Sequence, residues 1–302
     1  MFPLYYSKIY TDGISPKATF PRKRYRDVRA LLDSQDAGRS IAYHEPTAAF
    51  ANDLKLAHKS AYVEAFLSGS LDERAVRRIG LRPWTEAIVE RTLVLTNGTI
   101  LAMRHAVESG GFAGNLGGGT HHAYSDFGSG YCIFNDLAIS ALVARRDYGV
   151  SRILILDLDV HQGDGTAQIF ENDPDIRTVS FHCGTNFPFR KMTSDIDVEF
   201  APGTTDDEYL SSLEAFLQRD PHLFEPELIL FQAGVDVLET DKLGQLCLSH
   251  EGLRHRNGLV FSLAVSCGIP LVITMGGGYS SPLSPSVKAH GELFLQAAHS
   301  RA

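Results

Sequence analysis

Short apolar runs alternate along the chain with longer segments in which apolar residues recur every three or four positions. The short runs predict β-strands and the longer segments predict helices. The predicted strands cover residues 41–43, 152–158, 177–181, 228–232 and 271–275. The predicted long helices cover residues 53–67, 85–108, 136–148, 206–217 and 249–266. Such alternation is typical of an α/β fold, in which a parallel sheet lies between two layers of helices.

The run from residue 153 to residue 165 reads ILILDLDVHQGDG and combines a strand with polar residues at its end. Its apolar half has no polar break, which is typical of a parallel strand covered on both faces. Asp157, Asp159 and His161 follow at the carboxyl end, where ligands of such sheets gather. Residues two apart on an extended chain share a face, so Asp159 and His161 can converge on one ion, with Asp157 on the same side.

A second apolar run, residues 227–233, breaks at Gly234 and is followed by Asp236. Two carboxylates and one imidazole suit a zinc ion, and a catalytic zinc needs three protein ligands with one position left open. The spacing alone leaves two interpretations open. Asp159, His161 and Asp236 bind a metal, or the acidic residues cap helices and lie at the surface.

Two glycine-rich segments supply further candidates. Residues 117–123, GGGTHHA, place His121 and His122 after a glycine run that lets the backbone approach a ligand closely. A histidine of near-neutral pKa can take a proton from water and return it to a leaving amine. Residues 275–279, MGGGY, place Tyr279 after a predicted strand, where it can donate a hydrogen bond to an oxyanion. Taken singly, the histidines could equally be core residues and the tyrosine could fill a turn.

These four segments, with FPRKRY at residues 20–25 and LETDKLGQL at residues 238–246, resemble the zinc-dependent histone deacetylase and acetylpolyamine amidohydrolase superfamily. The resemblance runs in family order over nearly the whole chain. Gln162, where class I enzymes usually carry a second histidine, and the FPRKRY segment make it class IV-like. The resemblance implies an arginase/deacetylase-type three-layer α/β/α fold with a mainly parallel central sheet. Length alone allows one large domain or two smaller ones, and we expect a single deacetylase catalytic domain over residues 1–302 because no linker-like segment or charge block divides the span from His121 to Tyr279.

The resemblance also implies roles for individual residues. The implied Zn²⁺ ligands are Asp159, His161 and Asp236. The implied catalytic residues are His122 as general base and then acid, His121 as electrostatic help, and Tyr279, which polarises the scissile carbonyl. The implied partners of the two rings are Asp157 for His121 and Asp164 for His122. The implied substrate channel is lined by Gly130, Tyr131 and Phe187, with Tyr131 in place of the commoner phenylalanine. A structural K⁺ site is implied at the backbone carbonyls of Asp157, Asp159, His161, Ser180 and Phe181.

Three functions are compared with these residues. We expect a zinc amidohydrolase that removes acetyl or longer acyl groups from Nε-acyl-lysine of proteins, with acetylated polyamines or other small amides as alternative substrates. An arginase-like dimanganese hydrolase would need a bridging aspartate two positions beyond His161, where this chain has Gly163. A catalytically silent acyl-lysine-binding module would not need the proton shuttle of His121 and His122. The acyl chain length stays open, and residues 57–60 offer no acidic side chain to grip the substrate backbone.

The composition of the chain limits which binding partners and which cellular location we expect for the protein. The 302 residues are 44% hydrophobic and carry a formal net charge of −8, which disfavours general nucleic-acid binding and tolerates cationic substrates. The sequence has no run of about eighteen apolar residues, so we expect a soluble, intracellular, cytoplasmic protein without membrane contact.

Several residues of reactive or charged type are expected to be structural. The cysteines show no C-x-x-C spacing and are expected to be buried small hydrophobes without disulfides: Cys132, Cys183, Cys247 and Cys267. The basic cluster of Arg22, Lys23, Arg24 and Arg26 is expected to be a solvated helix face. Structural roles are also expected for His105 and His182.

Overall fold

Eight parallel strands form the central sheet in the part of the chain that the computed structural model describes, residues 1–36 and 39–300. The strands are β1 (Phe2–Tyr5), β2 (Ile41–His44), β3 (Phe112–Asn115), β4 (Ile153–Asp157), β5 (Ile176–Cys183), β6 (Ile196–Phe200), β7 (Leu228–Gln232) and β8 (Leu271–Thr274). Their order in the sheet is β2-β1-β3-β8-β7-β4-β5-β6. The five predicted strands are confirmed as β2, β4, β5, β7 and β8. The apolar pattern misses the other three because β1 contains proline, β3 contains glycine and asparagine, and the edge strand β6 contains two acidic residues.

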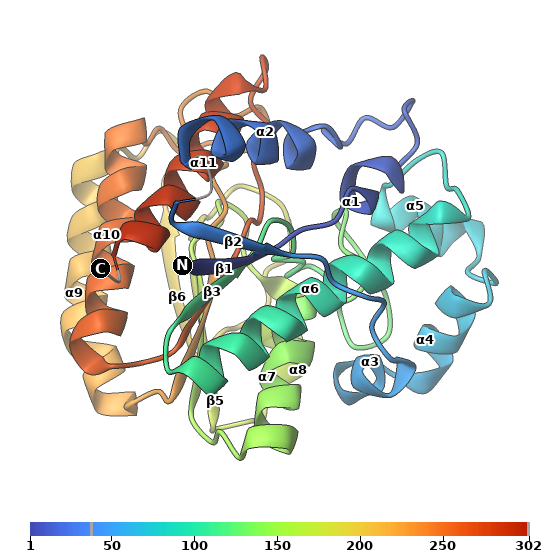
Figure 1. The fold of residues 1–302 in the computed structure, drawn as a ribbon, viewed down its shortest axis with the longest axis horizontal. Helices are drawn as coiled ribbons and strands as arrows, with labels where there is room; N and C mark the ends of the chain where they lie inside the picture. The colour runs from blue at the N-terminus through green and yellow to red at the C-terminus, as the bar shows by residue number, and fades with distance from the viewer. Residues whose placement is uncertain (37–38, 301–302) are drawn as a thin grey trace.

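Helices cover both faces of this sheet. They are α1 (Ile9–Asp12), α2 (Arg24–Asp36), α3 (Ala51–Ala57), α4 (Ser60–Leu67), α5 (Glu73–Ile79), α6 (Ala87–Ser109), α7 (Asp136–Tyr148), α8 (Asp164–Phe170), α9 (Asp206–Phe224), α10 (His250–Cys267) and α11 (Ser284–His299). Helices α9, α10 and α11 lie to the left of the strands in Figure 1, and α6, α7 and α8 lie to the right. The layers confirm the predicted three-layer α/β/α fold of the arginase/deacetylase type. None of the described helices is both long enough and apolar enough to span a membrane.

The long helices mostly follow the predicted ranges. Helices α6, α7 and α10 confirm the predictions over residues 85–108, 136–148 and 249–266, apart from small differences at the ends. Helix α9 begins at the predicted residue but continues through Pro221 to Phe224 instead of ending at Leu217. Its buried residues include Phe216, Pro221 and Phe224, so packing against the core extends the helix beyond its clearest periodicity.

The predicted helix over residues 53–67 is interrupted at His58. The chain forms α3 and α4 instead, and His58 between them is extended, with φ −120° and ψ 145°. The buried ring explains the break, because Nδ1 lies 2.9 Å from the backbone oxygen of Tyr124 and Nε2 accepts the backbone N–H of Asn135 at 2.9 Å. The apolar spacing continues through the break, so periodicity predicts one helix where tertiary hydrogen bonds produce two.

The register of the sheet brings distant segments to one row at its carboxyl edge. Asp157 of β4 pairs with Gln232 of β7 and with Ser180 of β5. Gln232 pairs in turn with Thr274 of β8, which pairs with Asn115 of β3. The loops that leave this row contain the predicted site residues, because parallel strands all end at the same edge. The sheet therefore assembles motifs that are far apart in the sequence.

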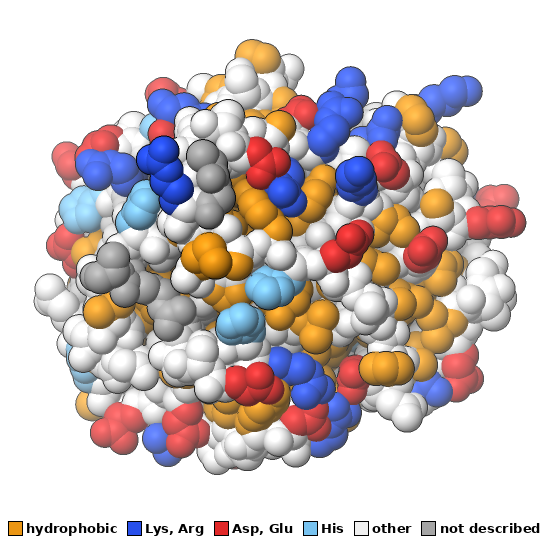
Figure 2. All heavy atoms as spheres, in the orientation of Figure 1, with side chains coloured by type: hydrophobic (Ala, Val, Ile, Leu, Met, Phe, Trp, Pro, Cys, Tyr) orange, Lys and Arg blue, Asp and Glu red, His pale blue; other side chains and the backbone are white. Residues whose placement is uncertain are grey.

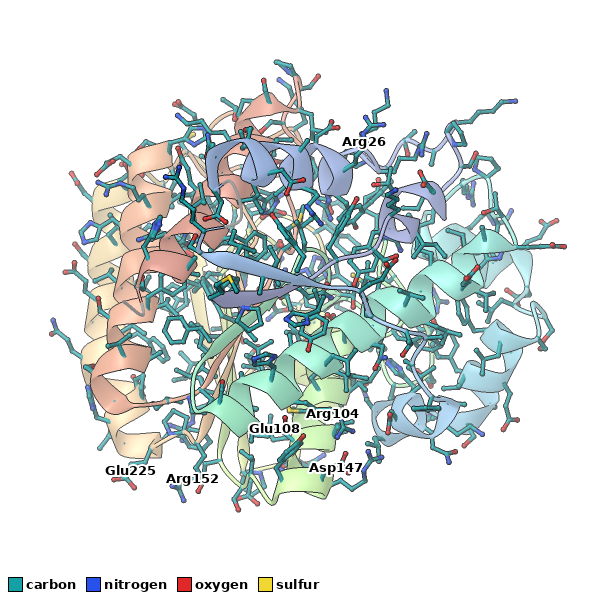
Figure 3. The ribbon with its side chains drawn as sticks, in the orientation of Figure 1. Arg26, Arg104, Glu108, Asp147, Arg152 and Glu225 are labelled. Carbon is teal, nitrogen blue, oxygen red and sulfur yellow. The ribbon has the colours of Figure 1, made fainter. Side chains whose placement is uncertain are left out.

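Burial of the central strands holds the layers together. Strands β4 and β7 are buried along their whole length, which explains their unbroken apolar runs. At the surface, Arg104 of α6 reaches Asp147 of α7 at 2.6 Å (Figure 3). A surface ion pair of this kind contributes up to about 1 kcal/mol. Burial of a single leucine or isoleucine contributes about 1.5–3 kcal/mol, so the apolar layers dominate.

The basic cluster at the start of α2 divides between surface and interior. Lys23 and Arg26 are exposed. Figure 2 shows several basic side chains at the upper right of this face, the region in which Figure 3 labels Arg26. Arg24 has only 4% of its surface exposed, and its guanidinium lies 4.9 Å from the ring centroid of Phe20. The prediction of a solvated helix face is therefore wrong for Arg24, because aromatic rings compensate for burial of its charge.

All four cysteines are free, as predicted. Cys132 and Cys183 are buried, but Cys247 and Cys267 are exposed, so the prediction of buried small hydrophobes is wrong for the second pair. Cys267 is the last residue of α10, at an end that faces solvent. Spacing along the sequence does not reveal such exposure, because it depends on which side of an element packs against the core.

Candidate active site

Asp159, His161 and Asp236 converge after β4 and β7 into one buried cluster. Nδ1 of His161 lies 3.0 Å from Oδ1 of Asp159 and 3.2 Å from Oδ2 of Asp236. Potential ligand atoms of the three residues lie within 4.8 Å of one another, and no other group of His, Cys, Asp or Glu among the described residues does the same. The structure thus brings together the three residues predicted as metal ligands.

The chemistry of this cluster fits a cation. Asp236 is completely buried, and its Oδ2, although close to the His161 ring, makes no hydrogen bond within the described part of the chain. Burial and the neighbouring Asp159 carboxylate raise the pKa of Asp236 to about 7. Two buried carboxylates side by side are costly unless a positive charge compensates for them. Two carboxylates and one imidazole are a suitable ligand set for a divalent metal.

Neighbouring groups hold the two carboxylates in place. Oδ2 of Asp159 accepts hydrogen bonds from the Gln232 side chain and from the backbone N–H of Gly277, both at 2.8 Å. Oδ1 of Asp236 accepts the backbone N–H of Val160 at 3.0 Å. A Cβ on Gly277 would lie 1.9 Å from Oδ2 of Asp236. The glycine run after β8 therefore makes room for the metal cluster as well as for a turn.

Two histidine–aspartate pairs lie beside the cluster. Nδ1 of His121 lies 2.6 Å from Oδ2 of Asp157. Nδ1 of His122 lies 2.6 Å from Oδ1 of Asp164. All four side chains are buried, and the pairs are those that the resemblance implies. Each carboxylate orients its ring through Nδ1, which leaves Nε2 of His122 for a molecule in the cavity that the ring lines.

The two rings differ in their charge. Burial opposes the charged form of His121, but the carboxylates of Asp157 and Asp159 outweigh burial and raise the pKa to about 9. Burial and the charge on His121 lower the pKa of His122 to about 4. Near neutral pH, His121 is therefore a cation and His122 is a neutral base.

Asp136, the first residue of α7, anchors the glycine loop that carries both histidines. Its buried carboxylate accepts the backbone N–H groups of Gly119 and Thr120, at 3.0 and 2.7 Å. Gly118 has φ +74°, and a Cβ there would lie 2.3 Å from Oδ2 of Asp136, so this turn requires glycine. The loop is therefore fixed from α7 and not only by its own backbone.

Tyr279 is held by contacts with two other segments. Its backbone N–H donates to Oδ2 of Asp241 at 2.6 Å, and the guanidinium of Arg24 lies 5.5 Å from its ring centroid. Arg24 also donates to the backbone oxygen of Gly278 at 3.4 Å. Burial raises the pKa of the Tyr279 hydroxyl well above its ordinary value, so the hydroxyl keeps its hydrogen and can donate it.

One cavity of about 460 Å³ unites these groups. Its lining includes Asp159, His161, His121, His122 and Tyr279. The predicted channel residues Gly130, Tyr131 and Phe187 line it as well. The Phe187 ring lies 4.9 Å from the His122 ring, and the Tyr131 ring lies 6.0 Å from the Tyr279 ring, measured between centroids. Aromatic walls around a few polar groups are typical of a ligand site for an aliphatic stem.

Of the residues implied for a K⁺ site, Asp157 ends β4, Asp159 and His161 lie in the loop after it, and Ser180 and Phe181 lie within the neighbouring strand β5. Asp157 pairs with Ser180 across these strands, and Phe181 follows Ser180. His182 is buried next to them, with Nδ1 3.0 Å from the Ser180 hydroxyl, so it has contacts suited to the predicted structural role. His105 of α6 lies beside His44, with ring centroids 5.7 Å apart.

Three polar residues of the site have no site prediction from the sequence: Gln232, Asp136 and Arg24. A signal exists for Gln232, because it is the one polar residue of an otherwise apolar buried strand. Asp136 ends the segment GSGYCIFND of residues 128–136, but an acidic residue at a helix start is common and indicates no more than a cap. For Arg24 the sequence suggests the opposite of burial, because it lies in a basic cluster whose members Lys23 and Arg26 are exposed.

Comparisons with known proteins agree with this arrangement. The histone deacetylase domain model matches residues 18–292. Histone deacetylase 2 of Arabidopsis thaliana is 32% identical over 275 residues, which cover 88% of this chain and 71% of that protein. The acetoin utilization protein AcuC of Staphylococcus aureus is 32% identical over 254 residues, which cover 78% of this chain and 65% of that protein. An uncharacterized protein of Picosynechococcus sp. is 40% identical over 292 residues, 97% of each chain. Since the domain model spans nearly the whole length, this chain belongs to the histone deacetylase family, within the superfamily that includes the acetylpolyamine amidohydrolases.

Proposed function

We propose that this chain is a zinc-dependent amidohydrolase that removes acetyl or longer acyl groups from Nε-acyl-lysine side chains of proteins. The observation that carries the proposal is one cavity lined by two metal-cluster residues, by His122 and by Tyr279. Amide hydrolysis without an acyl-enzyme needs activated water, a base that becomes an acid, and a donor to the oxyanion. Membership of the histone deacetylase family supports a deacetylating hydrolase.

The proton transfers are assigned to His122. A zinc ion held by Asp159, His161 and Asp236 would acidify water and polarise the amide carbonyl. His122 accepts a proton from the attacking water at Nε2, while Asp164 on Nδ1 stabilises the charged ring. His122 then gives this proton to the leaving lysine amine.

The remaining residues stabilise charge and hold the substrate. Tyr279 donates its hydroxyl hydrogen to the oxyanion, and the charged His121 ring adds positive potential to the site. Gly130, Tyr131 and Phe187 enclose the aliphatic stem of the substrate and keep water away from it. No side chain forms a covalent intermediate in this scheme, so the four cysteines have no part in it.

The proposal has four finer parts. Gln162 and the FPRKRY segment support a class IV-like deacetylase, and one catalytic domain is proposed over residues 1–302. A structural K⁺ is proposed at the carbonyls of Asp157, Asp159, His161, Ser180 and Phe181, supported by the pairing of Asp157 at the end of β4 with Ser180 of β5. A cytoplasmic location is proposed, supported by the four free thiols, which suit a reducing compartment.

The alternative functions differ in how well the site supports them. An acetylated polyamine or another small amide remains the alternative substrate. The same groups would hydrolyse any acylated amine whose aliphatic chain is narrow enough to enter the channel. A silent acyl-lysine-binding module gains no support from the His122–Asp164 pair, which serves proton transfer. A dimanganese site gains none either, because the described residues form one three-ligand cluster and residue 163 is glycine.

To test this proposal, the zinc-loaded protein is assayed with lysine peptides that bear acyl groups from acetyl to myristoyl. Acetylated polyamines are assayed in parallel. We expect turnover of the peptides and a loss of at least about 10²-fold in His122→Ala, since general acid–base catalysis contributes about 10²–10⁴-fold. Equal turnover by the variant, or no turnover by a protein shown to contain zinc, would refute the proposal.

A further inference from the structure

The mouth of the active-site cavity is locally basic, although the chain has a formal net charge of −8. Among the described residues that line the cavity, Asp159 is the one carboxylate, and it belongs to the metal cluster. The lining arginines are Arg24, Arg78 and Arg91, and they add to the charge of the His121 ring deeper in the site. Arg24 and Arg91 are buried and bonded inside the protein, as in the 3.0 Å hydrogen bond from Arg91 to the backbone oxygen of Tyr10. Of the three, Arg78 is the one exposed to solvent.

Arg78 has donors to spare for a ligand. It lies in the last turn of α5, and its guanidinium lies over the Phe127 ring, 4.3 Å from the centroid. A guanidinium that stacks on a ring keeps the N–H groups in its plane free for a carboxylate. Asp126, next to Phe127, pairs with Lys59 at 2.9 Å and not with Arg78. Within residues 1–36 and 39–300, no Asp or Glu forms an ion pair with Arg78.

Ring contacts connect Arg78 with the catalytic histidines. The Phe127 ring stacks on Tyr124, with centroids 4.4 Å apart. The Tyr124 hydroxyl donates to Asp164 at 2.9 Å, and Asp164 holds His122. Arg78 is therefore two stacked rings away from the carboxylate that orients the proposed base.

The backbone N–H of the channel residue Tyr131 donates to the backbone oxygen of Ile79, which follows Arg78, at 2.7 Å, and all three residues line the cavity. A residue adjacent to an acyl-lysine in the channel would therefore lie near Arg78.

The other exposed residues that line the cavity, which with Arg78 form its mouth, carry no negative charge. Thr185 and Gln245 are neutral, and Phe189 and Leu243 are apolar with 91% and 43% of their surfaces exposed. Arg190 follows Phe189, is exposed, and likewise has no ion pair with any described Asp or Glu. A bound substrate segment thus meets cations and apolar surface.

We propose that this mouth selects acyl-lysines flanked by a carboxylate and disfavours polycationic acyl-amines, with Arg78 as the specificity-determining residue. This selectivity rests on the proposed function, because it concerns the substrates of the same site. The net charge of −8 does not override it, since salt screens charges more than about 10 Å away at 0.1 M ionic strength. An exposed ion pair changes affinity only about two- to five-fold, so the effect is a preference that weakens with salt.

The test uses three peptides that differ only beside the acyl-lysine, with aspartate, asparagine or lysine on both sides. The full-length, zinc-loaded protein is assayed for kcat/KM with each peptide at low and high salt. We expect the aspartate peptide to exceed the lysine peptide by about five- to twenty-fold at low salt, with the asparagine peptide between them. Arg78→Glu reverses this order. Arg77→Glu is the matched control, because Arg77 is exposed on the same helix but does not line the cavity.

Anisotropy measurements of fluorescent forms of the same peptides separate this inference from the proposed function. A binding preference for the aspartate peptide without turnover of any peptide would support the inference and refute the hydrolase. Turnover with equal rates for all three peptides would support the hydrolase and overturn the inference. An equal shift in Arg77→Glu and Arg78→Glu would also overturn it, because remote charge would then explain the preference.

Discussion

The side-chain amide of Gln162 forms hydrogen bonds with both backbone polar groups of Met192. Nε2 of Gln162 donates to the backbone oxygen of Met192 at 2.8 Å, and the backbone N–H of Met192 donates to Oε1 at 2.9 Å. Nε2 also donates to Asp197 at 2.8 Å. Gln162 directly follows His161 of the metal cluster, and Met192 follows the segment that contains Phe187. One buried amide therefore connects the metal loop with the wall of the channel.

Replacement of Gln162 by alanine should loosen that wall. Both backbone polar groups of Met192 lose their partner, so we expect the free energy of unfolding to fall by about 2 kcal/mol. KM for an acyl-lysine peptide should rise several-fold with a smaller change in kcat, because Phe187 moves while the metal ligands stay. Urea denaturation and steady-state kinetics measure the two effects. Gln162→His keeps one hydrogen-bond donor on its ring, so its free energy of unfolding and its KM should lie between those of the wild type and those of the alanine variant. A destabilised variant with unchanged KM would show that the amide does not position the channel.

Asp236→Asn should have opposite effects on stability in the absence and in the presence of zinc. Without metal we expect the variant to be more stable than the wild type by about 1 kcal/mol or more, because a buried carboxylate beside Asp159 is removed. A chelator should lower the melting temperature of the wild type and leave that of the variant almost unchanged. Thermal unfolding with and without zinc measures both. Equal stabilisation of the two proteins by zinc would exclude Asp236 as a ligand.

His58 should make the protein sensitive to mild acid. Its ring donates from Nδ1 and accepts at Nε2, so the folded state needs the neutral form, and burial lowers the pKa to about 4 from 6.5. Below pH 6.5 the unfolded chain binds a proton that the folded chain does not bind. The stability from this group is therefore complete above pH 6.5, falls between pH 6.5 and 4, and is level below pH 4. The total loss is at most about 3 kcal/mol.

Urea denaturation of the wild type and of His58→Asn between pH 7.5 and 4.5 checks this prediction. The variant lacks the titrating ring, so its free energy of unfolding should fall less steeply with acid than that of the wild type. Parallel pH profiles would show that other groups cause the acid sensitivity.

Asp136→Asn should impair catalysis through the position of the histidine loop. One carboxylate oxygen becomes an NH₂ group, which cannot accept the backbone N–H of Gly119 or Thr120. We expect kcat to fall about 10- to 100-fold with little change in KM, because small shifts of His122 are costly for the reaction. Asp147→Asn is the control, since Asp147 is on the same helix but pairs with Arg104 at the surface (Figure 3). A similar loss in both variants would indicate a general effect on α7.

The ligand pair Asp159 and His161 shows what local sequence can predict. Both lie in the bend that follows β4, where the backbone N–H and the ring Nδ1 of His161 are each 3.0 Å from Oδ1 of Asp159. A spacing of two residues therefore keeps them close wherever that strand lies, although through a turn and not through the expected extended chain. Asp236 could be proposed from its own strand, but its distance to His161 depends on β4 and β7 being neighbours. Gln232 and Asp136 hold the site through contacts across 73 and 17 residues of sequence, which no periodicity encodes.

The sequence by itself determined the α/β class, most of the long elements and the chemical groups at the strand ends, because periodicity and apolar runs are properties of neighbouring residues. The tertiary structure decided the rest. It buried Arg24 among aromatic rings, split the predicted helix at His58 and exposed Cys247 and Cys267. It also gave the cavity mouth a local charge opposite to that of the whole chain. Burial, pairing and local charge depend on which distant segments pack together, and the spacing of residues along the chain does not contain that information.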